Sequence, residues 1–185
     1  MKPPVWKPLY LLLRLFGAPV SWEVSAGSVV FREIGPDRLY LVLRYRSGHF
    51  DFPKGHMEKG ETPEQTAQRE TGEEVNIWET EVLPFRKTIR FFYAPKGEEY
   101  EDRKAKGRGL LIFKVVHFFP LRTTQTEISV PKDSHENVSG EWLPYVEARR
   151  KLTHENARRV LDMAERAVVS EVDRCRKERD TVRNP

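Results

Sequence analysis

The stretch from Thr62 to Asn76 constrains the fold most, because it carries complete start and stop signals for one helix. Thr62 is a candidate N-cap, a proline follows at the first helical position, and Gln65 completes a capping box. Asn76 is expected to end the helix, since its short polar side chain tolerates the left-handed conformation. The buried face is predicted at three positions four residues apart: Ala67, Thr71 and Val75.

Strand patterns surround this helix on both sides. Runs of β-branched and apolar residues predict four strands, at 25–33, 39–45, 88–94 and 110–119. The run 95–109 between the last two is strongly polar, and we expect it to be a loop.

Two further patterns complete the expected fold. Residues 140–152 are expected to form a short strand or turn that leads into a helix. A long helix is predicted over 154–172, where one apolar stripe contains Val160, Leu161, Ala164, Val168 and Val172. Strands interleaved with two long helices predict an α/β (α+β) fold in which helices sandwich a mixed sheet.

One domain is expected, because 185 residues are enough for a single core. We place it at 25–172, between an N-terminal extension at 1–24 and a charged tail at 173–185 that is expected to fray. The extension contains the apolar run LYLLLRLF, which Arg14 interrupts and which is too short for stable membrane insertion. Packing on the domain, lying on a membrane surface and acting as a transit peptide all stay open for this segment.

Cysteine content and net charge limit the expected cellular compartment and the expected class of binding partner. The single cysteine, Cys175, excludes an internal disulfide and a cysteine zinc cluster. We therefore expect a cytoplasmic protein, or an organellar one if residues 1–24 are a transit peptide. A net charge of +4 and a pI of about 9.2 favour anionic partners such as nucleotides, nucleic acid or acidic membrane, without choosing among them.

Negative charge is nevertheless concentrated on the predicted helix. Glu70, Glu73 and Glu74 share one helical face, and residues 60–80 contain six acids and one base. Such crowding is either a solvated acidic face or a site for a hard divalent cation, because Mg²⁺ and Mn²⁺ prefer carboxylate and carbonyl oxygens.

The sequence from Gly55 to Ile77 resembles the signature of the Nudix hydrolase family. Seven positions match that signature in register: Gly55, Glu61, Arg69, Glu70, Glu73, Glu74 and Ile77. Thr71 stands where the family has an apolar residue, and Asn76 stands where it has a glycine. Both departures are mild, because the threonine methyl can pack and asparagine tolerates positive φ. The resemblance extends over residues 25–168.

The resemblance implies roles for these residues. Divalent cations, Mg²⁺ with Mn²⁺ as a substitute, would be bound by the Gly55 carbonyl and the three helix glutamates. Glu61 and Arg69 would brace the loop against the helix through an ion pair. The catalytic base stays open among Glu73, Glu74 and Glu136.

Two short segments resemble diadenosine tetraphosphate hydrolases more closely. The PKGH sequence also resembles diphosphoinositol polyphosphate phosphohydrolases; it implies that Lys54 contacts a phosphate and that His56 supports the loop. Ser134, Glu136 and Trp142 fall at the subfamily's spacing, although Asn137 stands where histidine is usual. Glu136 would then be a further metal ligand or base.

In a nucleotide substrate, the nucleobase would need an aromatic contact and the polyphosphate would need cationic contacts. Between residues 86 and 108, eight basic residues outnumber four acids. Tyr93 is the expected stacking residue, and Lys104 and Lys106 resemble a phosphate-contacting position of the subfamily. A buried core position stays open for Tyr93, and a solvated basic surface stays equally open for the two lysines.

The leading interpretation is a magnesium-dependent Nudix hydrolase that cleaves dinucleoside polyphosphates, with diadenosine tetraphosphate giving ATP and AMP. Other Nudix substrates stay open, namely RNA 5′ ends, diphosphoinositol phosphates and ADP-ribose. A Nudix-fold binding or regulatory module without catalysis is the alternative of another class. The complete set of glutamates favours an enzyme.

Overall fold

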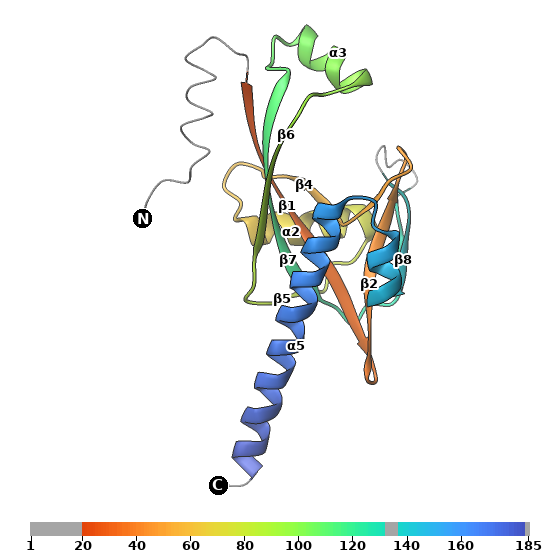
Figure 1. Cartoon of the computed structure of the whole chain (residues 1–185), viewed down its shortest axis with the longest axis vertical. Helices are drawn as coiled ribbons and strands as arrows, with labels where there is room; N and C mark the ends of the chain where they lie inside the picture. Colours follow the sequence, from red (N-terminus) through yellow and green to blue (C-terminus); the bar gives the residue numbers. More distant parts are fainter. Residues whose placement is uncertain (1–19, 132–136, 184–185) are drawn as a thin grey trace. The chain divides into compact units, whose positions relative to one another are not determined.

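The computed structural model of the chain describes residues 20–131 and 137–183, with side chains described as far as residue 171. Most of the N-terminal extension and Glu136 lie outside these residues. The elements labelled in Figure 1 are β1 (Val20–Ile34), β2 (Asp37–Tyr45), β3 (Phe50–Asp51), β4 (Lys54–His56), α2 (Pro63–Val75), β5 (Glu81–Val82), β6 (Lys87–Tyr93), α3 (Gly97–Ala105), β7 (Leu111–Arg122), β8 (Asn137–Pro144), α4 (Tyr145–Lys151) and α5 (Glu155–Arg183).

The strands form one eight-stranded sheet. Its main path runs β3-β2-β1-β7-β5, while β4 pairs with β1, β6 pairs with β7 and β8 pairs with β2. The hairpin of β1 and β2 is antiparallel, with Phe31 opposite Tyr40. β8 runs antiparallel to β2, with Trp142 opposite Leu41, and their register shifts between Arg44 and Tyr45.

The chain divides into two compact units, which we call the smaller and the larger unit. Of the described residues, the smaller unit contains 20–25 and Ile89–Val116. The larger unit contains Ala26–Thr88 and the described residues from His117 onward. The whole segment that resembles the Nudix signature therefore belongs to the larger unit.

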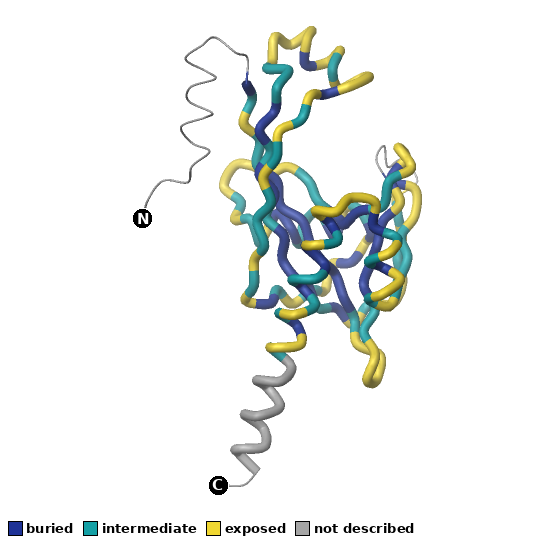
Figure 2. Tube along the Cα trace, in the orientation of Figure 1, coloured by how far each residue is buried: buried dark blue, intermediate teal, exposed yellow. Residues whose placement is uncertain are grey.

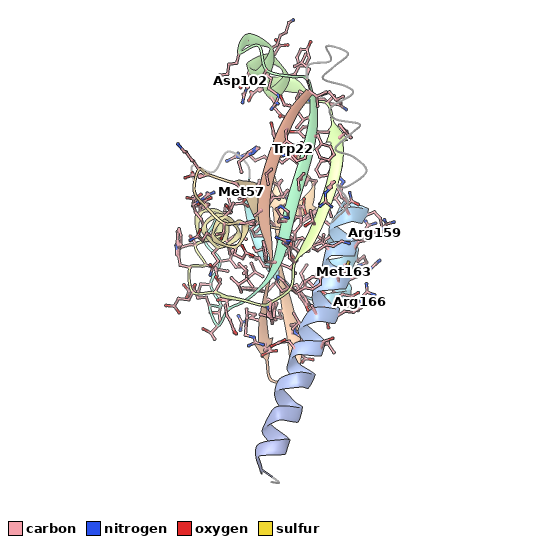
Figure 3. All side chains as sticks on the ribbon, turned by 90° about the vertical axis from the view of Figure 1, so that its left-hand side faces the viewer. Trp22, Met57, Asp102, Arg159, Met163 and Arg166 are labelled. Atoms are coloured by element: carbon pink, nitrogen blue, oxygen red, sulfur yellow. The ribbon has the colours of Figure 1, made fainter. Side chains whose placement is uncertain are left out.

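In the larger unit, helices cover both faces of the sheet, so the expected α+β class is confirmed. α2 lies on one face and α5 on the other (Figures 1 and 3). Apolar side chains from β1, β2, α2 and β7 form one buried cluster, which includes Val30, Leu41, Val75 and Leu121 (Figure 2). Of the stripe predicted on the last helix, four side chains are buried: Val160, Leu161, Ala164 and Val168.

The predictions for α2 are confirmed in detail. Thr62 caps the helix by accepting from the backbone N–H of Gln65, and the Gln65 side chain accepts from the Thr62 N–H. Asn76 ends the helix in the left-handed conformation, with φ of 58°. The three predicted core positions, Ala67, Thr71 and Val75, are fully buried.

Two predictions about secondary structure are wrong. Residues 95–109 are not a loop throughout, because α3 occupies 97–105. Acidic residues begin this helix and basic residues end it, which suits the helix dipole. The last helix does not end at residue 172, since α5 continues to Arg183. Its many Glu, Arg and Lys residues are good helix formers.

Buried charge anchors α3 within the smaller unit. Arg103 is 3% exposed, and its guanidinium pairs with Glu23 at 2.5 Å and donates to the Gly109 carbonyl at 3.0 Å. Aromatic rings pack nearby, with Trp22 (labelled in Figure 3) 4.9 Å from Phe113 between ring centroids. Long-range pairing of this kind explains why the local sequence did not reveal the helix.

No helix within residues 20–131 and 137–183 combines the length and the apolar character that a membrane crossing requires.

Candidate cation and phosphate site

Gly55 brings the loop backbone directly against the acidic helix. A Cβ atom added at Gly55 would lie only 2.0–2.2 Å from the carboxylate atoms of Glu70. Any side chain at this position would therefore displace the loop or the glutamate. The close approach is the physical reason for glycine here, and it puts backbone and carboxylate oxygens within one small region.

Arg69 ties the loop to the helix. Its Nε lies 2.7 Å from Glu61 Oε1, which is the ion pair expected from the sequence, and its Nη2 donates to the His56 carbonyl at 3.0 Å. The same guanidinium pairs through Nη1 with Glu70 at 2.8 Å and with Glu73 at 2.9 Å. Glu61 and the other acidic partners raise the pKa of Arg69, so it stays a cation.

Glu61 is held as a carboxylate by several donors. Arg69 is the strongest, and the Thr66 hydroxyl and the Glu58 N–H donate at 2.7 and 3.0 Å. Together these hydrogen bonds lower the pKa of Glu61 to about 2. Glu61 therefore braces the loop, in agreement with the structural role that the resemblance implies.

Glu74 turns inward, unlike its neighbour Glu73. Its Oε2 accepts from Asn137 Nδ2 at 2.6 Å and faces the Tyr45 hydroxyl at 3.4 Å, while its Oε1 accepts from the Lys54 N–H at 3.1 Å. Burial raises the pKa of Glu74 to about 7, although the Lys54 charge and these hydrogen bonds act in the opposite direction. The Glu73 side chain is 52% exposed.

The three helix carboxylates therefore share a face without pointing at a common centre. Among the described residues, no three His, Cys, Asp or Glu side chains are arranged to hold a metal ion. Glu70 and Glu73 are drawn to Arg69, and Glu74 is drawn to the strands. The donor set still fits a hard cation chemically, because it consists of carboxylates beside a backbone carbonyl.

Lys54 is engaged by protein groups. Its Nζ lies 3.0 Å from Asp51 Oδ2 and 3.2 Å from the Tyr45 hydroxyl, and it sits 4.4 Å from the centre of the Tyr45 ring. To contact a phosphate, as the sequence predicts, this ammonium would exchange Asp51 for the ligand. His56 supports the loop through its backbone carbonyl, which accepts from Arg69.

The remaining predicted contacts belong to the smaller unit. The Tyr93 hydroxyl donates to Glu99 at 3.0 Å, and burial raises the pKa of this phenol. Lys106 pairs with Asp102 at 2.6 Å, and Lys104 lies 5.8 Å from the Tyr100 ring. The acidic residues of α3 thus offset part of the predicted basic excess. Their role toward a ligand stays a prediction.

Sequence reasoning did not assign Tyr45, Asp51 or Asn137 to the site. Asn137 had one signal, since it stands where the similar subfamily has histidine. Tyr45 and Asp51 had none, because their contacts depend on strand pairing and loop geometry. Trp142, singled out with Glu136, lies in β8 and donates from Nε1 to the Thr126 carbonyl at 2.8 Å. Glu136 itself lies outside the described residues.

Comparison with known proteins gives concordant results. A family model described as NUDIX domain matches residues 22–163. A protein of Mycobacterium tuberculosis named MutT4 is 30% identical over 153 residues, which are 79% of this chain and 56% of that protein. A bis(5′-nucleosyl)-tetraphosphatase (asymmetrical) of Caenorhabditis elegans is 35% identical over 77 residues, which are 40% of this chain and 56% of that protein.

The chain spans little more than half the length of these curated relatives. Among solved structures, the binary complex of the C. elegans Ap4A hydrolase superposes with a TM-score of 0.60 at 24% identity, covering 82% of this chain and 98% of that one. This likeness shows a shared fold.

Proposed function

Because this chain belongs to the Nudix family, we propose that it is a divalent-cation-dependent hydrolase of pyrophosphate bonds in nucleotide derivatives. The observation that carries the proposal is the arrangement on α2. Glu70, Glu73 and Glu74 project from one face beside the Gly55 backbone, and the Arg69–Glu61 pair fastens the loop to that face. A merely solvated acidic face would need neither the glycine nor the brace.

We assign separate roles in cation binding and proton transfer to these residues. The Gly55 carbonyl and the three helix glutamates would hold Mg²⁺ or Mn²⁺, with Glu136 as a further ligand or base. The bound cation lowers the pKa of water and neutralises charge on the phosphates. Glu73 is the most exposed of the three helix glutamates, which suits it to orient the attacking water and accept its proton.

Dinucleoside polyphosphates are the proposed substrates, and diadenosine tetraphosphate is the proposed representative. Water would add across one P–O–P bridge, so that one product keeps three phosphates as ATP and the other keeps one as AMP. The PKGH segment and the tetraphosphatase relative support this choice. Lys54 would contact a phosphate. The contacts expected from Tyr93, Lys104 and Lys106 rest on the sequence resemblance alone.

A substrate panel tests the proposal. Purified full-length protein is assayed with Mg²⁺ and with Mn²⁺ against diadenosine tetraphosphate, ADP-ribose, a diphosphoinositol phosphate and a 5′-triphosphorylated RNA, and the products are separated by chromatography. We expect ATP and AMP from the first compound. Hydrolysis of no panel member would instead favour the non-catalytic module.

Charge-matched variants test the site. Glu73→Gln and Glu74→Gln should each lower kcat by at least about 100-fold, in the range found when one catalytic group is removed. Glu79→Gln removes the same charge from an exposed position outside the signature and should leave kcat unchanged. Full activity of both motif variants would refute the site assignment.

RNA 5′ ends are the second candidate substrate, because the net charge of +4 favours a polyanion. In that case pyrophosphate would be released from the triphosphorylated RNA, and binding would weaken steeply with added salt. Activity on diadenosine tetraphosphate with no RNA cleavage would exclude this candidate.

A further inference from the structure

A register shift between β2 and β8 brings Asn137 to the acidic helix. Arg44 lies opposite Ser139, but the next residue of β2, Tyr45, lies opposite Asn137. The intervening Val138 is the extra residue, and it is half exposed to solvent. Such a bulge re-aims the side chains beside it. Without the shift, the apolar Val138 would be the residue opposite Tyr45.

The re-aimed amide meets Glu74. Asn137 is 2% exposed, and its Nδ2 donates to Glu74 Oε2 at 2.6 Å. The Tyr45 hydroxyl lies 3.4 Å from the same oxygen and 2.9 Å from the Phe52 carbonyl, so it mainly fastens the loop and only supports Glu74. Asn137 is therefore the principal side-chain donor to this carboxylate.

The contact separates Glu74 from the Arg69 network. Arg69 pairs with Glu61, Glu70 and Glu73, whereas Glu74 is held by Asn137 on Oε2 and by the Lys54 N–H on Oε1. Glu74 is thus fixed in direction by groups other than Arg69 before any ligand binds. Hydrogen bonds to a ligating carboxylate restrict its rotation and tune its affinity for a metal.

We propose that Asn137 is a positioning residue for the cation-dependent reaction, acting through Glu74. The inference rests on the proposed function and adds to it a residue outside the Nudix signature. The amide orients the carboxylate and leaves its remaining lone pairs for the cation.

The direct test is Mn²⁺ binding without substrate, measured by electron paramagnetic resonance of the free ion. Asn137→Leu keeps the shape and removes the donor, and we expect binding to weaken about 10- to 100-fold. Asn137→His restores a donor and should recover most of the loss. Tyr145→Phe is the matched control, because it removes a hydroxyl–carboxylate bond to Asp162 of 2.7 Å elsewhere in the larger unit; Mn²⁺ binding should not change.

A double-mutant cycle separates positioning from a general structural role. If Asn137 acts through Glu74, adding Asn137→Leu to Glu74→Gln should weaken Mn²⁺ binding no further. Losses that multiply would overturn the proposal. If Asn137→Leu fails to fold, as judged by circular dichroism, Asn137→Ser replaces it in the cycle, since serine is too short to reach Glu74.

The outcomes distinguish the two claims. Wild-type protein that neither binds Mn²⁺ nor hydrolyses any panel member would refute the proposed function, and the positioning role with it. Wild-type protein that does both, together with an Asn137→Leu variant that binds Mn²⁺ equally tightly, would refute only the positioning role. A lower kcat with unchanged KM in Asn137→Leu would agree with positioning.

Discussion

At the scale of single residues, Gly55 and Arg69 decide how the acidic helix meets its loop. Gly55 does not have a positive φ, so the reason for glycine is space for the Glu70 carboxylate. Arg69 joins three acidic side chains and one backbone carbonyl through a single guanidinium. Lysine has no planar fork of donors and could not make this set of contacts.

Gly55→Ala should therefore strain the site. We expect a loss of about 1–3 kcal/mol in the free energy of unfolding, the usual range for overpacking, and a large loss of activity. Urea unfolding and a turnover assay measure the two effects. Adding Glu70→Ala removes the atoms that the new methyl group would meet, so the double variant should regain stability. Strictly additive losses would contradict the steric explanation.

The lowered pKa of Glu61 predicts that the free energy of unfolding falls in acid. Because Arg69, Thr66 and the Glu58 N–H lower its pKa to about 2 from an ordinary value of 4.5, the folded state binds fewer protons than the unfolded chain in this interval. The stability that Glu61 contributes is present above pH 4.5 and is lost as the pH falls toward 2.

Urea unfolding at a series of pH values measures this contribution. Glu61→Gln should be less stable than wild type at neutral pH, with a difference that shrinks in acid. Arg69→Met removes the main cause of the shift and should flatten the same part of the profile. Parallel profiles for all three proteins would rule the linkage out.

At the scale of elements, α2 was predictable because its signals are local. The capping box, the proline and the four-residue spacing all lie within the helix itself. α3 was not predictable, because Arg103 is buried against Glu23, 80 positions away. The contact between Asn137 and Glu74 was hidden for a similar reason, since it depends on a register shift that the sequence does not display.

Asn76 allows the end of α2 to be tested. Asn76→Gly and Asn76→Ala both remove the side-chain amide, which accepts from Trp78 Nε1 at 3.0 Å. Only alanine resists the φ of 58° at this position, so its variant should be about 1 kcal/mol less stable than the glycine variant. Thermal and urea unfolding give the difference. Equal stability would show that the left-handed conformation carries no cost here.

At the scale of the whole molecule, the sequence predicts the family and the fold class, while the division into two units is visible only in the structure. Six of the seven matches to the signature lie in β4, the following loop and α2, and Ile77 lies two residues beyond the helix, so spacing in sequence largely determines spacing in space. The predicted base and polyphosphate contacts come from outside this segment, so a short motif carries little information about them. Tyr93, Lys104 and Lys106 illustrate this limit, since they belong to the smaller unit while the signature lies in the larger one.

The stability of α3 in the smaller unit should depend on the buried guanidinium of Arg103. Arg103→Met removes the 2.5 Å pair with Glu23 and leaves that carboxylate with the more distant Lys114, at 3.4 Å. Breaking a buried pair costs about 3–5 kcal/mol, so amide hydrogen exchange in α3 should accelerate strongly while exchange in α2 stays unchanged. Arg108→Met is the control, because its pair with Asp102 is exposed to solvent and contributes little to stability. Equal exchange in the two variants would contradict the anchoring role.

Arg69 has one more consequence, which concerns the protein deprived of metal. Its guanidinium serves as a built-in counterion for Glu70 and Glu73, so their repulsion is already compensated without a bound cation. Small zinc domains unfold when chelators remove the metal that holds them together. Here EDTA should stop hydrolysis and remove only the modest stabilisation that any bound cation adds, so the metal-free protein should still unfold cooperatively. In Arg69→Met the thermal midpoint should rise more steeply with added Mg²⁺ than in the wild type. In differential scanning calorimetry the metal-free wild-type chain would thus show the cooperative unfolding transition of a folded protein.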